Sequence, residues 1–195
     1  MTTAPDVRTR RREQTREEIL AAAWDLAERD GIARLSLRDL ANDVGMRAPS
    51  LYTYFASKAA IYDAMFAAGY RQLDAALAGL HLDLEAPVDS VAATLEAFVG
   101  FCQASTPRYQ LMFTRAVPDW EPSAEAYAVS VASYARMTDQ LALLGIREPR
   151  DIDLLSALSS GLAAQQLAND PHGDRWRRLS LDAAAMFLDH VRRPR

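Results

Sequence analysis

The side chains best suited to chemistry with a partner are concentrated in residues 46–66, MRAPSLYTYFASKAAIYDAMF. This segment contains three tyrosines and two phenylalanines, together with two serines, a threonine and a lysine. Hydroxyl groups can hydrogen-bond to phosphates or to base edges, and a lysine adds a positive charge that suits a phosphate. Binding to a partner such as DNA is therefore one interpretation of the segment, and a buried aromatic core is the other.

Residues for catalysis or metal binding are, by contrast, sparse. The three histidines, His81, His172 and His190, lie far apart, and none has the spacing of a metal-binding motif. The sequence has no G-x-S-x-G, no phosphate-binding glycine loop and no dinucleotide fingerprint. Its one cysteine, Cys102, excludes an intrachain disulfide and a multi-cysteine zinc site. The sequence thus predicts no catalytic residue, no metal and no cofactor, and a protein that is not an enzyme.

Charge is distributed unevenly along the chain. The net charge is −4, which on its own argues against a general nucleic-acid binder. Residues 1–16, however, carry five arginines against two acidic side chains, whereas residues 59–195 carry 12 basic against 17 acidic ones. A basic N-terminal arm on an acidic body is typical of a protein that contacts phosphates at one end only. A solvated tail is the alternative interpretation of the arm.

Composition predicts an all-α fold of one or two small domains. Alanine and leucine dominate the 195 residues and β-branched residues are sparse, which favours helix. No run approaches the roughly 20 apolar residues that a membrane helix needs. No apolar segment follows the basic N-terminus, as one would in a signal peptide. We therefore expect a cytoplasmic protein that makes no contact with a membrane.

Start and stop signals divide the chain into consecutive helices. A capping box of Thr15 and Glu18 predicts a first helix that ends at Gly31. Ser36 is the predicted N-cap of a second helix that ends at Gly45. The remaining helices are predicted at residues 49–54, 58–80, 88–105, 107–116, 121–145, 150–168 and 174–192.

The helix predicted at residues 58–80 sets the domain organisation. Ser57 is its expected N-cap, and at 1.5 Å per residue it spans roughly 35 Å, which is long enough to link two domains. We therefore predict a small domain at residues 1–57 and a larger helical domain at residues 58–195, bridged by this helix.

Residues 40–51 have the spacing of a helix-turn-helix. Two helices that cross near a right angle need a small residue where they approach most closely, and Ala41 supplies it. The tight turn between them needs a residue that adopts a left-handed conformation, and Gly45 meets that need. Leu51 then lies six residues further on and fills the wedge between the helices. Such a unit places its second helix in the major groove of DNA.

A longer stretch around this unit is similar to a known family. TREEILAAAWDLAERDGIARLSLRDLANDVGMRAPSLYTYFASKAAIY, residues 15–62, resembles the DNA-binding domain of the TetR family of transcriptional repressors, and LYTYFASK is its most distinctive part. The resemblance implies a three-helix DNA-binding domain, a connecting helix, and a helical domain that binds a small ligand and dimerises. It also implies a homodimeric repressor that a small, largely hydrophobic ligand releases from a palindromic operator on double-stranded DNA.

The resemblance assigns DNA-binding roles by position in the second helix, the recognition helix and the start of the connecting helix. The residues so assigned are Arg38, Arg47, Ala48, Pro49, Ser50, Tyr52, Thr53, Tyr54 and Lys58. Many family members have a serine at position 47, where it would cap the recognition helix. Arg47 cannot act as a cap and could instead reach a phosphate or a guanine of the DNA. After the lysine that matches Lys58 the family often has a glutamate, whereas this sequence has Ala59 and Ala60. Phe55 lies four residues after Leu51, so we expect it in the core.

The second half of the sequence offers candidates for a ligand pocket. Apolar and aromatic side chains are spaced to line helix faces, and a few polar groups lie among them, as in most small-molecule sites. The candidates are Phe98, Phe101, Gln103, Tyr109, Met112, Phe113, Trp120, Tyr127, Tyr134, Met137 and Gln165. Any of them could equally be a core residue.

The last two predicted helices are candidates for a dimer interface. Small residues at spacings of three and four allow helices to approach closely, and these are Ser156, Ser160, Gly161 and Ala164. They are interleaved with apolar residues, namely Leu155, Leu158, Leu162, Phe187 and Leu188. We expect a four-helix interface across a two-fold axis, with two recognition helices about 34 Å apart on DNA. An internal helical hairpin is the alternative.

Two other hypotheses for the whole chain remain. It could be a helical small-molecule-binding protein or enzyme that retains a helix-turn-helix-like fold. It could also be a DNA-binding regulator that responds to no ligand.

Overall fold

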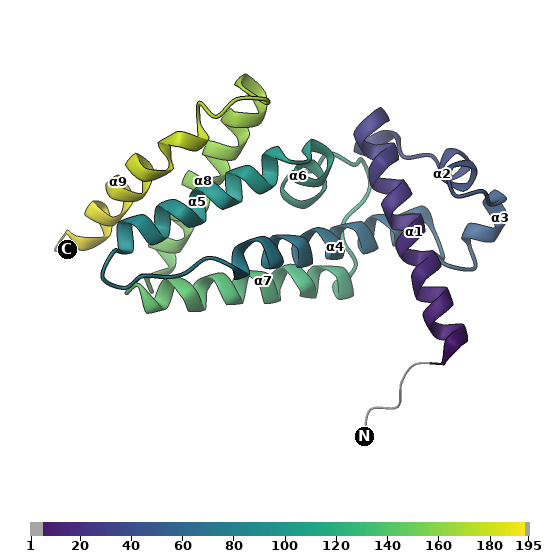
Figure 1. The fold of residues 1–195 in the computed structure, drawn as a ribbon, viewed down its shortest axis with the longest axis horizontal. Coiled ribbons are helices and arrows are strands. Elements are labelled where there is room, and N and C mark those ends of the chain that lie inside the picture. Colours follow the sequence, from purple (N-terminus) through teal and green to yellow (C-terminus); the bar gives the residue numbers. More distant parts are fainter. Residues whose placement is uncertain (1–5, 194–195) are drawn as a thin grey trace. The chain divides into compact units, whose positions relative to one another are not determined.

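The computed structural model describes residues 6–193, and over this range the chain is all-α, as predicted (Figure 1). No strand occurs among these residues. The α-helices are α1 (Val7–Asp30), α2 (Leu37–Asp43), α3 (Ala48–Leu51), α4 (Lys58–Ala78), α5 (Pro87–Gln103), α6 (Thr106–Phe113), α7 (Ala124–Leu143), α8 (Pro149–Asn169) and α9 (Ser180–Arg192). Two short 3-10 helices, η1 (Ile32–Arg34) and η2 (Arg177–Leu179), precede α2 and α9.

Helix α1 begins two turns earlier than the sequence predicts. Its first residue is Val7, and the Thr15 hydroxyl donates a hydrogen bond to the Arg11 carbonyl at 3.0 Å, which places Thr15 inside the helix. The capping box predicted at Thr15 is therefore wrong. The arginines and glutamates that precede it are good helix formers and continue the helix backwards. The described part of the basic arm is thus helical, while residues 1–5 of the predicted arm lie outside the described residues.

Two predicted helix caps are confirmed, and they frame the short helix α3. The Ser36 hydroxyl accepts from the Asp39 amide at 3.3 Å, and the Ser57 hydroxyl accepts from the Ala60 amide at 3.1 Å. Arg47 occupies the N-cap position of α3 and provides no side-chain cap. Helix α3 has only four residues, shorter than the predicted 49–54, and residues 52–54 form a turn.

The turn between α2 and α3 has the geometry of a helix-turn-helix. Gly45 has φ +66°, in the left-handed region that side chains rarely adopt. The Met46 amide donates to the Ala41 carbonyl at 2.8 Å, which closes the end of α2. Ala41 and Leu51 are each 1% exposed, so the small residue and the wedge residue are both buried as predicted.

The chain divides into two compact units that do not follow the linear order of the sequence. The first contains residues 1–69 and 107–127, and the second contains residues 70–106 and 128–195. The predicted functional boundary after residue 57 stays a prediction, since compactness alone does not assign function. Helices α4 and α7 each begin in the first unit and end in the second.

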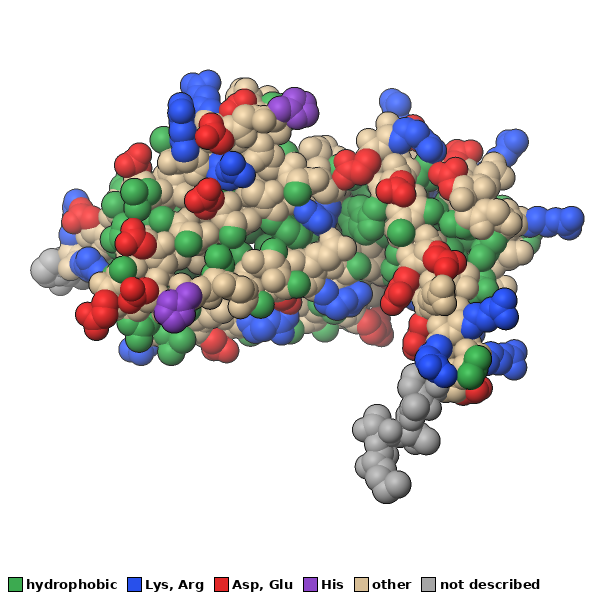
Figure 2. Space-filling view, in the orientation of Figure 1, with side chains coloured by type: hydrophobic (Ala, Val, Ile, Leu, Met, Phe, Trp, Pro, Cys, Tyr) green, Lys and Arg blue, Asp and Glu red, His purple; other side chains and the backbone are tan. Residues whose placement is uncertain are grey.

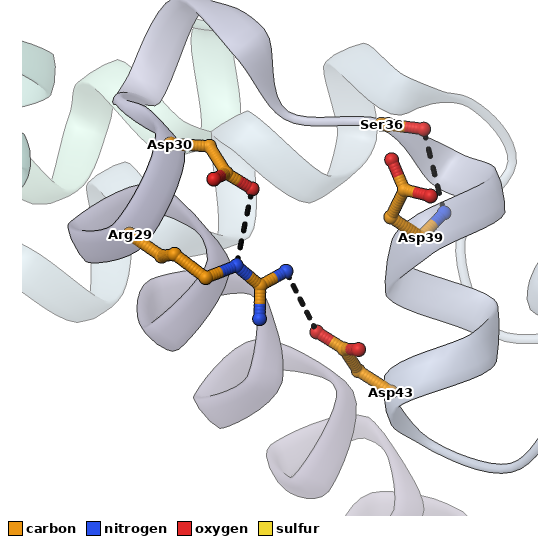
Figure 3. A network of polar contacts seen from close by, with 5 residues as sticks. All are labelled: Arg29, Asp30, Ser36, Asp39 and Asp43. Carbon is orange, nitrogen blue, oxygen red and sulfur yellow. Dashed lines mark hydrogen bonds and ion pairs between the residues drawn. The ribbon is translucent and has the colours of Figure 1, made fainter.

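The first unit has a single apolar core built from the inner faces of α1, α2, α3 and α4. Its fully buried side chains include Ile19, Leu26, Leu40, Leu51, Ile61 and Met65. At the edge of this core, the Arg29 guanidinium donates to the Asp30 carboxylate at 3.2 Å and to the Asp43 carboxylate at 3.5 Å (Figure 3). The hydrogen bond that Arg29 donates to Asp30 is the main reason that the pKa of Arg29 is raised. This exposed cluster ties the end of α1 to the end of α2.

In the second unit, α5 packs against both α8 and α9 (Figure 1). The fully buried Gln166 organises the connection between the last two helices. Its side-chain oxygen accepts from the Trp176 and Arg177 amides at 2.9 and 3.1 Å, and its nitrogen donates to the Asp170 and Gly173 carbonyls. Because these bonds hold a loop, α9 begins at Ser180 rather than at the predicted residue 174. No helix in the described range is both long and apolar enough to span a membrane.

The left-handed conformation at Gly45 yields a test of the helix-turn-helix geometry. A Cβ atom at Gly45 would meet nothing within 4 Å, so any cost of Gly45→Ala comes from the backbone alone. We expect this change to lower the free energy of unfolding by about 1 kcal/mol. Gly79→Ala is the matched control, because that position is equally open and has no left-handed φ. Equal unfolding free energies for the two variants in urea titrations would contradict this role of Gly45.

Candidate nucleic-acid interface

The residues predicted to bind DNA lie on the outer side of α3 and its following turn. Pro49, Ser50 and Thr53 are exposed, and Tyr52 is 56% exposed. Arg38 on α2 and Arg47 before α3 are also exposed, whereas Ala48, Tyr54 and Lys58 are half-buried. The predicted residues therefore come from α2, from α3 and its following turn, and from the start of α4, and they offer hydroxyls, an aromatic ring and cations to a partner.

The inner side of the same segment is apolar. Leu51 is 1% exposed and Phe55 is 3% exposed, so the expectation that Phe55 belongs to the core is confirmed. The aromatic cluster of residues 46–66 thus divides into rings that build the core and a tyrosine, Tyr52, that faces outward. A segment whose two faces differ in this way can present polar groups to a partner without exposing its core.

Two arginines of α1 hold the turn that follows α3, an arrangement that the sequence analysis missed. The Arg12 guanidinium donates to the Thr53 carbonyl at 2.9 Å, and Arg16 donates to the Tyr54 carbonyl. The Arg16 guanidinium also lies 4.2 Å from the centre of the Phe55 ring. The spacing of four between the two arginines was the available signal, because it puts both on one face of a helix once α1 is known to begin at Val7.

The beginning of α4 is fixed by an aromatic residue that the DNA prediction did not include. Lys58 has its ammonium 5.4 Å from the centre of the Tyr62 ring, within the range of a cation–π contact. The Tyr62 hydroxyl donates to the Ile32 carbonyl at 2.9 Å. Burial raises the pKa of Tyr62 to about 12, so its hydroxyl is neutral at ordinary pH. These contacts place a cation beside the N-terminus of α4, a position that favours a phosphate.

Positive charge gathers on the first half of α1. Figure 2 shows Lys and Arg side chains clustered around the start of that helix on the face in view. Arg8, Arg10 and Arg11 are exposed there, as is Arg12. The basic residues that sequence analysis placed in an arm are therefore presented by a helix that packs against the helix-turn-helix.

Several of the predicted ligand-binding residues lie in the first unit, and Trp120 is one of them. Its indole nitrogen donates to the Asp63 carboxylate at 3.2 Å, and its ring lies against Tyr62 and Phe66 at centroid distances of 5.6 and 5.9 Å. Tyr109 and Phe113 pack together at 5.9 Å. Met112 is 6% exposed, and Tyr127 is 57% exposed.

The other predicted ligand-binding residues lie in the second unit. Phe101 is buried, Phe98 and Met137 are half-buried, and Tyr134 and Gln165 are exposed. The Gln103 amide donates to the Pro171 and Gly173 carbonyls at 3.1 and 2.7 Å, so it supports the loop before α9. The ligand-binding assignment of the whole set stays a prediction.

Two features bear on other chemistry. Among residues 6–193, no group of three or more His, Cys, Asp or Glu side chains could hold a metal ion. An open polar hollow in the second unit is lined by Gly145, Arg147, Glu148, Asp151, Val191 and Arg193, and it includes none of the predicted ligand-binding residues.

The buried hydroxyl of Tyr62 predicts a pH dependence of stability. The pKa of Tyr62 is raised from about 10 in the unfolded chain to about 12 in the folded one, so its contribution is complete below pH 10 and is lost as pH rises towards 12. The wild type should therefore lose up to about 1.4 kcal/mol of unfolding free energy per pH unit there, relative to Tyr62→Phe. At pH 7 the variant should be about 1 kcal/mol less stable, because it removes the hydrogen bond that the Tyr62 hydroxyl donates to the Ile32 carbonyl.

Urea titrations of both proteins at pH 7 and between pH 9 and 11 measure this difference. Tyr52→Phe is the control. That side chain is largely exposed, so the substitution should change neither the unfolding free energy at pH 7 nor its pH dependence. If wild type and Tyr62→Phe lose stability in parallel above pH 10, the buried neutral hydroxyl is not the source of the dependence.

Comparisons with known proteins agree with this geometry. Residues 19–65 match the sequence model of a family described as bacterial regulatory proteins, tetR family. No curated protein matches the sequence. A TetR-like transcriptional regulator from Rhodococcus sp. RHA1 shares 25% identity with a TM-score of 0.61, over 91% of this chain and 96% of that one.

Two further solved structures have the same fold. PfmR, a TetR family transcriptional regulator from Thermus thermophilus, is 21% identical with a TM-score of 0.64, over 90% of this chain and 99% of that one. NalD from Pseudomonas aeruginosa, described as the secondary repressor of the MexAB-OprM multidrug efflux pump, is 20% identical with a TM-score of 0.61, over 91% and 96%. Residues 19–65 therefore match the N-terminal domain of the tetR family, and the described chain has the fold of solved tetR-family regulators.

Proposed function

We propose that the protein is a homodimeric repressor that binds a palindromic DNA operator and leaves it when a small, largely hydrophobic ligand binds. The observation that carries the proposal is the two-sided segment at α3, which is buried at Leu51 and Phe55 and exposed at Ser50, Tyr52 and Thr53. A helix-turn-helix with such an outer face suits the major groove of DNA. We assign the chain no enzymatic activity.

In this proposal the DNA contacts divide into two kinds. Ser50, Tyr52 and Thr53 offer hydroxyls to base edges or phosphates, while Ala48 and Pro49 offer apolar contact to a thymine methyl group. The remaining predicted residues contact the phosphate backbone of the DNA or a guanine base, and these are Arg38, Arg47, Tyr54 and Lys58. Base contacts give specificity, and phosphate contacts give position and salt dependence.

The proposed dimer interface lies on the outer sides of α8 and α9. Leu154, Leu181 and Met186 are 42%, 53% and 64% exposed, which is unusual for large apolar side chains. Gly161 and Ala164 are exposed on α8, so a partner helix could approach closely there. Several leucines and a phenylalanine predicted for this interface are instead buried within the protein's own core, namely Leu155, Leu162, Phe187 and Leu188.

A route for ligand release follows from the composition of the first unit. Residues 107–127 come from the middle of the chain, yet they pack in the same compact unit as α1 to α3. Asp63 on α4 accepts from the Trp120 indole and from the Ser123 amide, both at 3.2 Å. A Cβ atom at Gly69 would lie 2.6 Å from the Met112 sulfur, so the Met112 side chain of α6 packs directly on the α4 backbone. A ligand that displaces α6 should therefore displace α4.

Two alternatives would give different results. A helical small-molecule-binding protein or enzyme would bind no DNA sequence selectively, even at low salt. A regulator without an effector would bind its operator with the same affinity in the presence of any small molecule.

The DNA-binding proposal predicts distinct losses for two variants. DNA duplexes selected by the wild-type protein from a random pool provide the probe. We expect Tyr52→Ala and Lys58→Ala each to weaken binding by about tenfold, with only Lys58→Ala also reducing the salt dependence, by about 0.9 in the log–log slope. Leu84→Ala, which changes a 59% exposed side chain outside the proposed interface, is the control. Unchanged affinity in both variants, measured by fluorescence anisotropy, would show that the wrong face has been assigned.

The dimer proposal predicts that a charge on α9 separates the subunits. Met186→Glu should convert the dimer to a monomer at micromolar concentration, because burying a carboxylate without a partner is costly. Leu143→Glu places the same charge at a 66% exposed position at the end of α7 and should leave the dimer intact. Light scattering coupled to size-exclusion chromatography measures both masses. A dimer that survives Met186→Glu would place the interface elsewhere.

A further inference from the structure

We propose that Arg12 and Arg16 of α1 are positioning residues that clamp the turn after α3 and thereby set how Tyr52 and Thr53 meet DNA. The two arginines donate hydrogen bonds to the backbone carbonyls of residues 53–54. Their proposed effect on DNA rests on the proposed function, while their effect on the turn does not.

The need for a clamp follows from the length of α3. Four residues make about one helical turn, and so short a helix has almost no stability of its own. The last carbonyls of any helix also lack partners within the helix. Here the Leu51 carbonyl is used twice, accepting from the Tyr54 and Phe55 amides at 2.9 Å each. Further along the chain, the carbonyls of Thr53 and Tyr54 accept hydrogen bonds from Arg12 and Arg16 of α1.

Arg16 is shaped for this task in two ways. Its planar guanidinium donates to the Tyr54 carbonyl and at the same time lies 4.2 Å from the centre of the Phe55 ring. A lysine could not stack a planar group on the ring in this way, because its ammonium is a compact charge. A cation near the C-terminal end of a helix also interacts favourably with the helix dipole. Arg16 therefore fixes the backbone on one side of the turn while Phe55 anchors it in the core.

Arg12 holds the part of the turn that bears the proposed base-reading side chains. Its bond to the Thr53 carbonyl acts on the residue directly after Tyr52. Arg12 and Arg16 are four residues apart on α1, so both reach the turn from the same face of one rigid helix. Arg10 is also exposed on α1, and there it suits a phosphate contact. In this proposal the arginines of α1 have two roles. Arg12 and Arg16 position the turn that carries Tyr52 and Thr53, whereas Arg10 adds positive charge for phosphates.

Positioning and phosphate binding leave different signatures in DNA affinity. A lost phosphate contact weakens binding to every sequence and lowers the slope of log affinity against log salt by about 0.9. A lost positioning contact weakens only the selected sequence and leaves the slope unchanged. The probes are a duplex selected from a random pool by the wild-type protein and a shuffled duplex of the same composition.

We expect Arg16→Gln to weaken binding to the selected duplex by about tenfold, with binding to the shuffled duplex changed by less than about twofold and an unaltered salt slope. Arg10→Gln is the matched control and should weaken both duplexes in parallel with a smaller slope. Arg12→Gln removes only an exposed hydrogen bond and should give the pattern of Arg16→Gln at smaller amplitude, so it decides the matter if Arg16→Gln fails to fold. A parallel loss on both duplexes in the Arg12 and Arg16 variants would overturn the proposal.

A second measurement needs no DNA and separates this proposal from the proposed function. Amide hydrogen exchange of the full chain should speed up in residues 52–56 of both clamp variants by about tenfold and remain unchanged there in Arg10→Gln. If the wild type selects no duplex at all, the proposed function fails, and the exchange data alone decide whether the clamp exists. Unchanged exchange in residues 52–56 of the Arg12 and Arg16 variants would refute the clamp.

Discussion

The proposed DNA-binding surface of this protein depends on a constraint of length: α3, the proposed recognition helix, has only four residues and must be held by its neighbours. Three features meet this need. The buried side chains of Leu51 and Phe55 anchor the inner side of the segment, and Gly45, with φ +66°, sets the direction in which the chain enters α3. The Arg16 guanidinium binds the Tyr54 carbonyl and lies against the Phe55 ring. Each acts on backbone or core atoms, so the outer hydroxyls and rings remain available for a partner.

The same logic explains which parts of this region could be predicted from the sequence. Helix caps and small residues at helix crossings are local requirements of particular backbone shapes. The sequence alone therefore predicts the caps at Ser36 and Ser57 and the small residue Ala41. The sequence does not predict the start of α1, because Thr15 and Glu18 match a capping box although they lie in the middle of the helix. Without the correct start of α1, the hydrogen bond from Arg12 to a residue 41 positions away could not be predicted either.

In the second half of the chain, hydrophobic periodicity does not predict which residues line a ligand pocket. Periodicity separates a buried helix face from an exposed one, but it does not distinguish a core from the wall of a cavity. Gln103 and Trp120 fit the pattern of pocket residues, yet their polar atoms hold a loop and a neighbouring helix respectively. The loop before α9 is similarly governed by the fully buried Gln166, whose role depends on carbonyls and amides that only the fold brings to it.

The central claim is that the outer side of α3 and its following turn read DNA bases, and photo-crosslinking from position 52 tests it most directly. With p-benzoylphenylalanine in place of Tyr52, irradiation of the complex with a selected duplex should link the protein to bases at defined positions. The shuffled duplex should give little product. Equal crosslinking to both duplexes, or a crosslink to the selected duplex only from position 134, a 49% exposed tyrosine in the second unit, would contradict the account.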